Sequence, residues 1–254
     1  MSFEERIAEL NRMIAGARRI VFFTGAGIST GSGIPDFRSD NGLYITSLED
    51  SPEYMLSATC LAAEPERFFE YLRNNMDFRG YYPNIAHRKI SELQLARTVS
   101  VVTQNIDGLH EKAGSKVVDA IHGTMDKFYC PGCGSDIFHP EDVMDGNYDN
   151  SDGVPKCILC GGDSVIRPDI TLYGEGLPIT PWTLALQHIR QADLLIVVGT
   201  SLQVAPANML VSYFGNDNKT VIINRDETPF DDCCALRFHE DICDVFSRIE
   251  VPEA

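Results

Sequence analysis

Short apolar runs rich in strand-forming residues recur along the chain. The first covers residues 19–24, Arg-Ile-Val-Phe-Phe-Thr, and ends directly before a glycine. Runs without polar alternation are typical of strands buried on both faces of a parallel sheet. The pattern predicts strands at 19–24, 98–103, 193–198 and 219–223, with weaker ones at 117–121 and 235–238.

Helical patterns lie between several of these runs. Ser2 and Glu5 have the spacing of a capping box. Apolar residues then recur at helical spacing, at Ile7, Leu10 and Ile14. Two further helices are predicted over 83–97 and 180–191, each with a proline at a plausible first turn. Strands that alternate with helices predict an α/β fold, a doubly wound parallel-sheet domain of the Rossmann-like kind.

Two segments interrupt this alternation. The first, about 40–95, is predicted to be a helical insertion, with apolar side chains on one helix face at Phe68, Phe69, Leu72 and Met76. The second, about 126–166, is rich in Gly, Asp and Asn and poor in apolar residues, so we expect a metal to supply the stability that its core cannot. The Rossmann-like core of a single domain spanning 1–254 then comprises about 1–39, 96–125 and 167–254.

Four of the eight cysteines form two tight pairs inside the second insertion. They read Cys130-Pro-Gly-Cys133 and Cys157-Ile-Leu-Cys160. Each Cys-x-x-Cys unit presents two thiolates from one turn, and tetrahedral zinc takes four such ligands. The competing interpretation is a redox-active pair. Two pairs flanking a segment without a core favour a small zinc-ribbon module with one structural zinc ion, whose four thiolates leave no position for catalysis.

Net charge and the N-terminus narrow the class of protein. The chain of 254 residues carries a net charge of -16, which repels phosphate backbones and disfavours nucleic acid as a direct partner. The same acidity favours encounter with basic peptides, or simply keeps the protein dissolved. No apolar run approaches the roughly 18 residues of a membrane helix, and the acidic N-terminus is no signal peptide. We therefore expect a cytoplasmic protein without a membrane partner.

A glycine-rich turn follows the first predicted strand. Gly25-Ala26-Gly27 would let the backbone approach a pyrophosphate at the start of a helix, although a tight turn needs glycine in any case. The dehydrogenase fingerprint is imperfect, because Thr30 stands where a third glycine would be and no acid marks the second strand. The imperfect fingerprint speaks against an ordinary NAD dehydrogenase, which is kept as an alternative.

Longer motifs carry a resemblance to a known family. The series Gly-Ala-Gly-Ile-Ser and Gly-Ile-Pro-Asp-Phe-Arg (25–38) is followed in order by further blocks: 103–110, 121–123, 167–170, 174–175, 199–204 and 223–224. Together with the cysteine pairs, this ordered series resembles the sirtuins, which are NAD-dependent protein lysine deacylases. The resemblance implies removal of acyl groups, chiefly acetyl, from lysine side chains of proteins or peptides, giving nicotinamide and 2'-O-acyl-ADP-ribose.

The resemblance also implies the residues that bind NAD. They are Gly25, Ala26, Gly27, Thr30, Asp36, Phe37, Arg38, Gln104, Asn105, Ile106, Asp107, His122, Gly199, Thr200, Ser201, Asn224 and Ile242. The turn with Gly25, Ala26, Gly27 and Thr30 would line the pyrophosphate and ribose. Residues 104–107 would hold a ribose hydroxyl, an ordered water and the nicotinamide amide, and 200–201 with Asn224 and Ile242 would hold the adenosine half. Simpler roles exist for some of them: Asp107 suits a helix N-cap, and Phe37 suits an ordinary core.

His122, with Asn105 and Asp107, completes the implied catalytic set. A histidine at a strand end is often only a hydrogen-bonded structural residue, but histidine also titrates where a general base must. In the sirtuin reaction the acyl oxygen attacks the ribose as nicotinamide leaves, and a histidine then takes a proton from a ribose hydroxyl. His122 is implied to be that base, whereas His87 and His110 are assigned structural roles.

Three alternatives to a deacylase remain at this point. They are the dehydrogenase, a protein ADP-ribosyltransferase on the same scaffold, and a non-enzymatic NAD-sensing module.

The choice of acyl group is a separate expectation. Family members that favour succinyl groups resemble one another in a Tyr-x-x-Arg pair, and the matching positions here are the apolar Phe69 and Leu72. A buried carboxylate would find no partner there, so we expect succinyl to be disfavoured.

Overall fold

A computed structural model of the chain describes residues 1–36 and 51–252. Its larger part contains a six-stranded parallel sheet with the order β3-β2-β1-β6-β7-β8. The strands are β1 (Arg19–Thr24), β2 (Thr98–Thr103), β3 (Val118–Ala120), β6 (Leu194–Val198), β7 (Thr220–Ile223) and β8 (Leu236–Phe238). All six predicted strands are confirmed, with ends within one residue of the prediction.

The order of strands reverses at β1, in the middle of the sheet. Phe22 of β1 lies beside Val101 of β2 on one side and Ile196 of β6 on the other. Because the chain builds outward in both directions from β1, the carboxyl ends of β1 and β6 form a topological switch point. In open α/β sheets this is where ligands bind.

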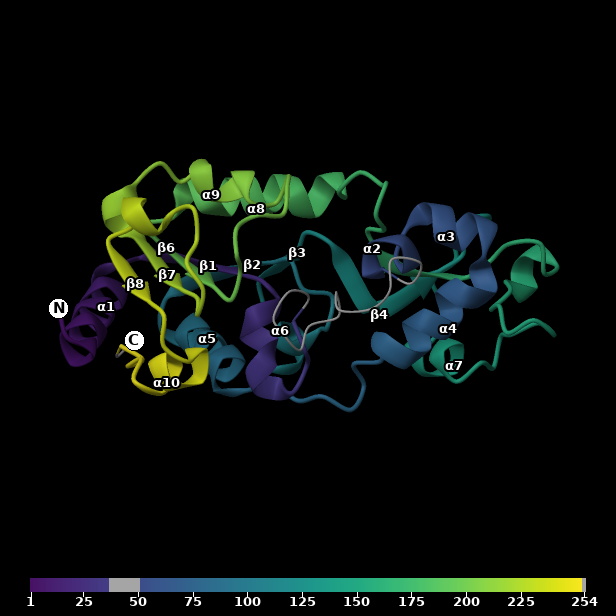
Figure 1. The fold of residues 1–254 in the computed structure, drawn as a ribbon, viewed down its shortest axis with the longest axis horizontal. Helices are drawn as coiled ribbons and strands as arrows, with labels where there is room; N and C mark the ends of the chain where they lie inside the picture. Colours follow the sequence, from purple (N-terminus) through teal and green to yellow (C-terminus); the bar gives the residue numbers. More distant parts are fainter. Residues whose placement is uncertain (37–50, 253–254) are drawn as a thin grey trace.

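Helices cover both faces of this sheet (Figure 1). Against one face, around Phe22, lie α1 (Phe3–Gly16), α5 (Ile85–Ala96) and α10 (Ile242–Ser247). Against the other, around Phe23, lie α8 (Ile179–Gln191) and α9 (Met209–Ser212). The architecture is therefore the predicted doubly wound one, with an apolar core on each side of the sheet.

The helix starts follow local sequence, with one correction. Ser2 and Glu5 form the predicted capping box at the start of α1. Pro83 was expected in the first turn of its helix, but α5 begins at Ile85. The side chain of Asn84 caps α5 by accepting from the Ala86 amide at 2.9 Å, so the proline precedes the cap. A side-chain cap satisfies an amide that would otherwise lack a partner, which explains the shift.

The second part of the molecule lies at one end of the sheet domain (Figure 1). It holds α2 (Pro52–Met55), α3 (Ala58–Ala63), α4 (Pro65–Asn75), α7 (Pro140–Met144) and an antiparallel pair, β4 (Gly123–Tyr129) and β5 (Arg167–Ile170). Both insertions share one apolar core, in which Phe68 and Leu72 of α4 join Phe128 and Val143. The cysteine-containing segment therefore does bury apolar side chains, but only together with the helical insertion.

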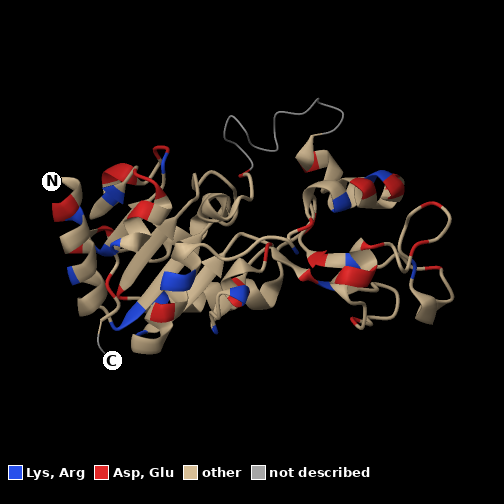
Figure 2. Ribbon diagram, turned by 90° about the horizontal axis from the view of Figure 1, so that it is seen from below, with Lys and Arg blue, Asp and Glu red and all other residues tan. Residues whose placement is uncertain are grey.

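The predicted module boundaries stay predictions. β4 crosses the predicted boundary at 125/126, and it pairs with β5, which begins at the predicted boundary at 166/167, outside the six-stranded sheet. Acidic positions occur in both parts of the molecule (Figure 2). Within the described residues, every helix is too short or too polar to span a bilayer.

Candidate active site

Two glycine-containing turns meet at the switch point: one holds Gly25 and Gly27 after β1, and the other holds Gly199 after β6. η1 (Ala26–Ser32) follows β1, and the Gly27 amide donates to the Gly199 carbonyl oxygen at 2.8 Å. A Cβ on Gly27 would lie 2.8 Å from the Gly199 Cα, and a Cβ on Gly25 would lie 2.7 Å from the Thr200 Cβ. Side chains are thus excluded where the turns touch. Bare backbone at the carboxyl ends of β1 and β6 is what close approach to a pyrophosphate requires.

A buried carboxylate lies beside the turn after β1. Asp107 is 5% exposed, and its Oδ2 accepts from the Ser29 hydroxyl at 2.6 Å and from the Asn105 amide at 3.4 Å. Its Oδ1 accepts from the Leu109 amide at 2.9 Å, at the start of α6 (Leu109–Lys112). Burial raises the pKa of the Asp107 carboxyl, and the hydrogen bond from Ser29 opposes that rise.

These contacts give Asp107 part of the structural role considered from the sequence. Its Oδ1 holds the first amide of α6, as a capping carboxylate does. Asn105 is tied to the same cluster, because its Nδ2 also donates to Ser29 Oγ at 3.1 Å. Ser29, Asn105 and Asp107 therefore form one hydrogen-bonded group at the carboxyl ends of β1 and β2.

His122 has a defined tautomer. Its Nδ1 lies 2.9 Å from the carbonyl oxygen of Gln104. A carbonyl only accepts, so Nδ1 carries the proton, and in the neutral ring Nε2 is left as the basic atom. Burial lowers the pKa of His122, and the hydrogen bond to the Gln104 carbonyl partly offsets this. The ring is thus held neutral, with its basic nitrogen available, over a wider pH range than an exposed histidine.

Gln104 connects the two halves of the site. Its side-chain Nε2 donates to Thr200 Oγ1 at 3.1 Å, and its backbone amide donates to the Thr24 carbonyl oxygen at 2.9 Å. Thr200 is 8% exposed and lies in the turn after β6. The ends of β1, β2 and β6 are therefore bound to one another by the residues expected around the ribose.

The residues expected on the adenosine side lie near the ends of β6 and β7. Asn224 follows β7 and is 9% exposed, with its side-chain amide donating to the Asp226 carbonyl at 2.8 Å. Ile242 opens α10, which lies against η1. Arg225 reaches Asp36 at 4.0 Å, linking this side to the segment after η1. Ser201 is partly exposed in the turn after β6.

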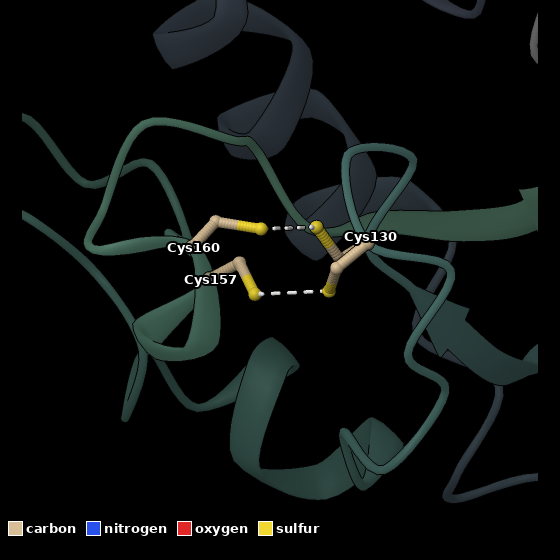
Figure 3. A group of neighbouring side chains, drawn as sticks. Cys130, Cys157 and Cys160 are labelled. Atoms are coloured by element: carbon tan, nitrogen blue, oxygen red, sulfur yellow. Dashed lines mark hydrogen bonds between the residues drawn. The ribbon is translucent and has the colours of Figure 1, made fainter.

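The four paired cysteines converge in the second part of the molecule (Figure 3). Their sulfur atoms all lie within 4.8 Å of one another, with 3.6 Å between Cys130 and Cys160 and 3.8 Å between Cys133 and Cys157. Tetrahedral zinc with bonds of about 2.3 Å separates its sulfurs by about 3.8 Å. Paired knuckles with four sulfurs at this spacing fit zinc rather than two separate redox pairs.

Comparison with known proteins identifies this arrangement. The model of the Sir2 family matches residues 25–206 of this chain. The chain belongs to the Sir2 family. The NAD-dependent protein deacetylase of Staphylococcus aureus is 44% identical over 243 residues, covering 94% of this chain and 96% of that protein. The NAD-dependent protein deacetylase of Listeria monocytogenes is 43% identical over 219 residues, covering 86% and 90%.

Solved structures of Sir2 proteins have the same fold. One, bound to p53 peptide and NAD+, superposes with a TM-score of 0.84 at 35% identity, covering 95% of this chain and 96% of that chain. Another, a histidine-to-alanine variant with deacetylated p53 peptide and 3'-O-acetyl ADP-ribose, gives a TM-score of 0.86 at 36% identity with the same coverage. A third holds a propionylated peptide, at a TM-score of 0.83 and 34% identity.

For this Sir2 family member, the structure gathers most of the predicted site residues around one end of the sheet. Phe37 and Arg38 lie outside the described residues. Sequence reasoning missed Ser29 as a partner of Asp107, and it missed Thr24 as the partner of Gln104. Ser29 belongs to the motif Gly-Ala-Gly-Ile-Ser, but the spacing of that motif does not predict a contact with Asp107, 78 positions later.

Proposed function

We propose that this chain is an NAD-dependent protein deacetylase that removes acetyl groups from lysine side chains. The observation that carries the proposal is family membership along nearly the whole chain, with relatives of that name at 44% identity. NAD is consumed as co-substrate, and the acetyl group leaves on ADP-ribose while nicotinamide and free lysine are released. The Sir2 structures with NAD+, acetylated peptide and acetyl-ADP-ribose support this reaction.

The proposed NAD site runs along the switch point. The bare backbone of Gly25, Gly27 and Gly199 would accommodate the pyrophosphate, and Thr200, Ser201, Asn224 and Ile242 would bind the adenosine half. The Ser29, Asn105 and Asp107 cluster would hold the nicotinamide end. Its hydrogen bonds fix the Asp107 carboxylate before any ligand enters, which lowers the entropy cost of binding.

The proposed general base is His122. Its Nδ1–H is held by the Gln104 carbonyl, so Nε2 is the atom that takes a proton from a ribose hydroxyl. Its lowered pKa keeps that nitrogen unprotonated at neutral pH, because the base form predominates above the pKa. The charge that His122 gains is then stabilised by the same carbonyl oxygen.

Zinc is proposed to be structural. Cys130, Cys133, Cys157 and Cys160 would fill a tetrahedral shell, leaving no ligand position for a substrate. Bound zinc would stabilise the fold of the second part by tying residues 130–133 to 157–160. Reduced thiols of this kind are typical of the cytoplasm, which we propose as the compartment.

The proposed substrates are proteins with acyl-lysine side chains, and not nucleic acids, which the net charge of -16 repels. Succinyl groups are expected to be poor substrates. Phe69 and Leu72 are at most 1% exposed within the shared core, and Arg73 on the same helix is turned to Asp149 at 2.7 Å. Arg67 pairs with Glu64 at 2.6 Å. Neither arginine of α4 is therefore available to a distal carboxylate.

Mass spectrometry of one acetyl-lysine peptide tests the function. With NAD present, the peptide should lose the mass of the acetyl modification, and nicotinamide and O-acetyl-ADP-ribose should appear in equal amounts. Without NAD the peptide should stay unchanged. A peptide that gains ADP-ribose would show a transferase instead, and NADH absorbance would show a dehydrogenase.

A further inference from the structure

Two buried histidines lie behind the proposed NAD site, and the chemistry above uses neither. His87 on α5 and His110 on α6 are 0% and 1% exposed, with ring centroids 4.8 Å apart and ring planes at 63°. His110 Nε2 lies 3.1 Å from the hydroxyl oxygen of Thr24, the last residue of β1. Within the described residues, both nitrogens of His87 and Nδ1 of His110 have no hydrogen-bond partner. The side chains of the pair thus make a single hydrogen bond, to Thr24.

That single hydrogen bond joins a chain of contacts to the proposed base. The Thr24 carbonyl oxygen accepts from the Gln104 amide at 2.9 Å. The Gln104 carbonyl oxygen in turn lies 2.9 Å from Nδ1 of His122. Thr24 is therefore linked to the imidazole of His122 through the two backbone hydrogen-bonding groups of Gln104.

We propose that His110 is a positioning residue for His122, acting through Thr24 and the backbone of Gln104. The hydrogen bond between His110 and Thr24 anchors the end of β1 from the interior, and Gln104 is bound to that end. This inference rests on the proposed function, because it takes His122 as the base. A base that is misplaced by even 1 Å loses much of its rate advantage.

A neutral hydrogen bond, and not charge, carries this effect. Burial lowers the pKa of His87 to about 4 and lowers that of His110 well below its usual value, so both rings are uncharged at neutral pH. The nicotinamide end should be largely spared when this bond is lost. Asp107 is held by Ser29 and Asn105 as well as by α6, so its carboxylate does not depend on His110 alone.

The two activities of the enzyme separate the base step from the rest. Exchange of labelled nicotinamide into NAD, with acetylated peptide present, requires cleavage of NAD but not the proton transfer to His122. Deacetylation requires both. The ratio of the deacetylation rate to the exchange rate therefore does not depend on the fraction of folded protein. A merely structural role of His110 would change that fraction and leave the ratio unchanged. We expect His110→Leu to lower this ratio about 10-fold.

Four further variants isolate the hydrogen bond from packing. Thr24→Val removes only the hydroxyl from a strand residue and should lower the ratio by a similar factor. The double variant with His110→Leu should add nothing, because both changes remove the same bond. His110→Gln, which keeps a hydrogen-bonding group, should recover most of the ratio. His87→Leu is the matched control, since it removes an equally buried ring that makes no hydrogen bond, and its ratio should equal that of the natural protein.

An unchanged ratio in both His110→Leu and Thr24→Val would overturn the inference, as would an equal loss in His87→Leu. If His110→Leu does not fold, Thr24→Val and His110→Gln still decide the matter. Failure of the proposed function has a separate signature, because the natural protein would then show neither exchange nor deacetylation.

Discussion

The contact between the two glycine turns makes Gly199→Ala an informative perturbation. Gly199 has φ of +62°, a left-handed conformation, and its Cβ would lie 2.6 Å from the carbonyl carbon of Gly27 and closer still to the amide nitrogen of Ile28. Ordinary contact begins at 3.4 Å, so the Gly27 contact alone requires the turns to separate by about 0.8 Å, and the closer Ile28 nitrogen requires more. The turn that moves is the one proposed to hold the pyrophosphate.

The expected cost has three parts. The left-handed conformation costs about 1 kcal/mol for alanine. Weakening of the 2.8 Å hydrogen bond from the Gly27 amide to Gly199 costs about 1 kcal/mol, and crowding against the opposing backbone costs about 1–3 kcal/mol. The sum, about 3–5 kcal/mol, is a large share of the roughly 5–15 kcal/mol by which a domain is stable.

Two measurements check this prediction. Urea unfolding should show a loss of about 3 kcal/mol or more, and titration calorimetry should show NAD affinity lowered by about 100-fold if the backbone shift reaches the pyrophosphate. Gly215→Ala is the matched control, because Gly215 also has positive φ, +65°, but no atom would lie within 4 Å of its Cβ. If Gly199→Ala were as stable and bound NAD as tightly as Gly215→Ala, the close-contact argument would be wrong.

Other predictions concern the base, the metal and the acyl group. His122→Ala should abolish deacetylation while calorimetry still shows NAD binding, and substantial product formation would refute its role. In the natural protein the acid limb of kcat/KM should lie below about pH 6.5, because the base form is needed and burial lowers the pKa of His122; a limb at or above 6.5 would contradict this. Cys157→Ser should lose zinc and thermal stability together, measured by metal analysis and calorimetry, whereas exposed Cys233→Ser should lose neither. Acetyl peptide should be deacylated at least about 10-fold faster than its succinyl counterpart, given a desolvation cost of a few kcal/mol; equal rates would show that the α4 argument fails.

Features with a local signal were predictable from the sequence. The six strands of the sheet were predicted because a strand buried on both faces must be apolar throughout, as Ile196 and its neighbours in β6 are. The zinc site was predictable because each pair supplies two ligands at fixed spacing. The capping box of α1 is equally local.

Features made by residues distant in sequence were not predictable in this way. The shared core of the second part joins Phe68 to Phe128 and Val143, and no periodicity indicates which insertions pack together. The Ser29–Asp107 hydrogen bond and the His87–His110 contact depend on how β1, α5 and α6 meet in space. The predicted start of α5 at Pro83 was wrong for a simpler reason. The side chain of Asn84, one residue later, caps the helix and determines where it begins.

The shared core also constrains the order of events during synthesis. Helix α4 leaves the ribosome with only α2 and α3 to cover Phe68 and Leu72, and the rest of their core, from Phe128 onward, is translated later. The second zinc knuckle is complete only when Cys160 emerges. The nascent chain therefore carries a partly covered apolar helix until Phe128 and Val143 are made, about 60 to 75 residues after Phe68, at roughly 5–20 residues per second. Supply of zinc at that moment, and shielding of α4 by a chaperone until then, should limit the yield of native enzyme in the cell.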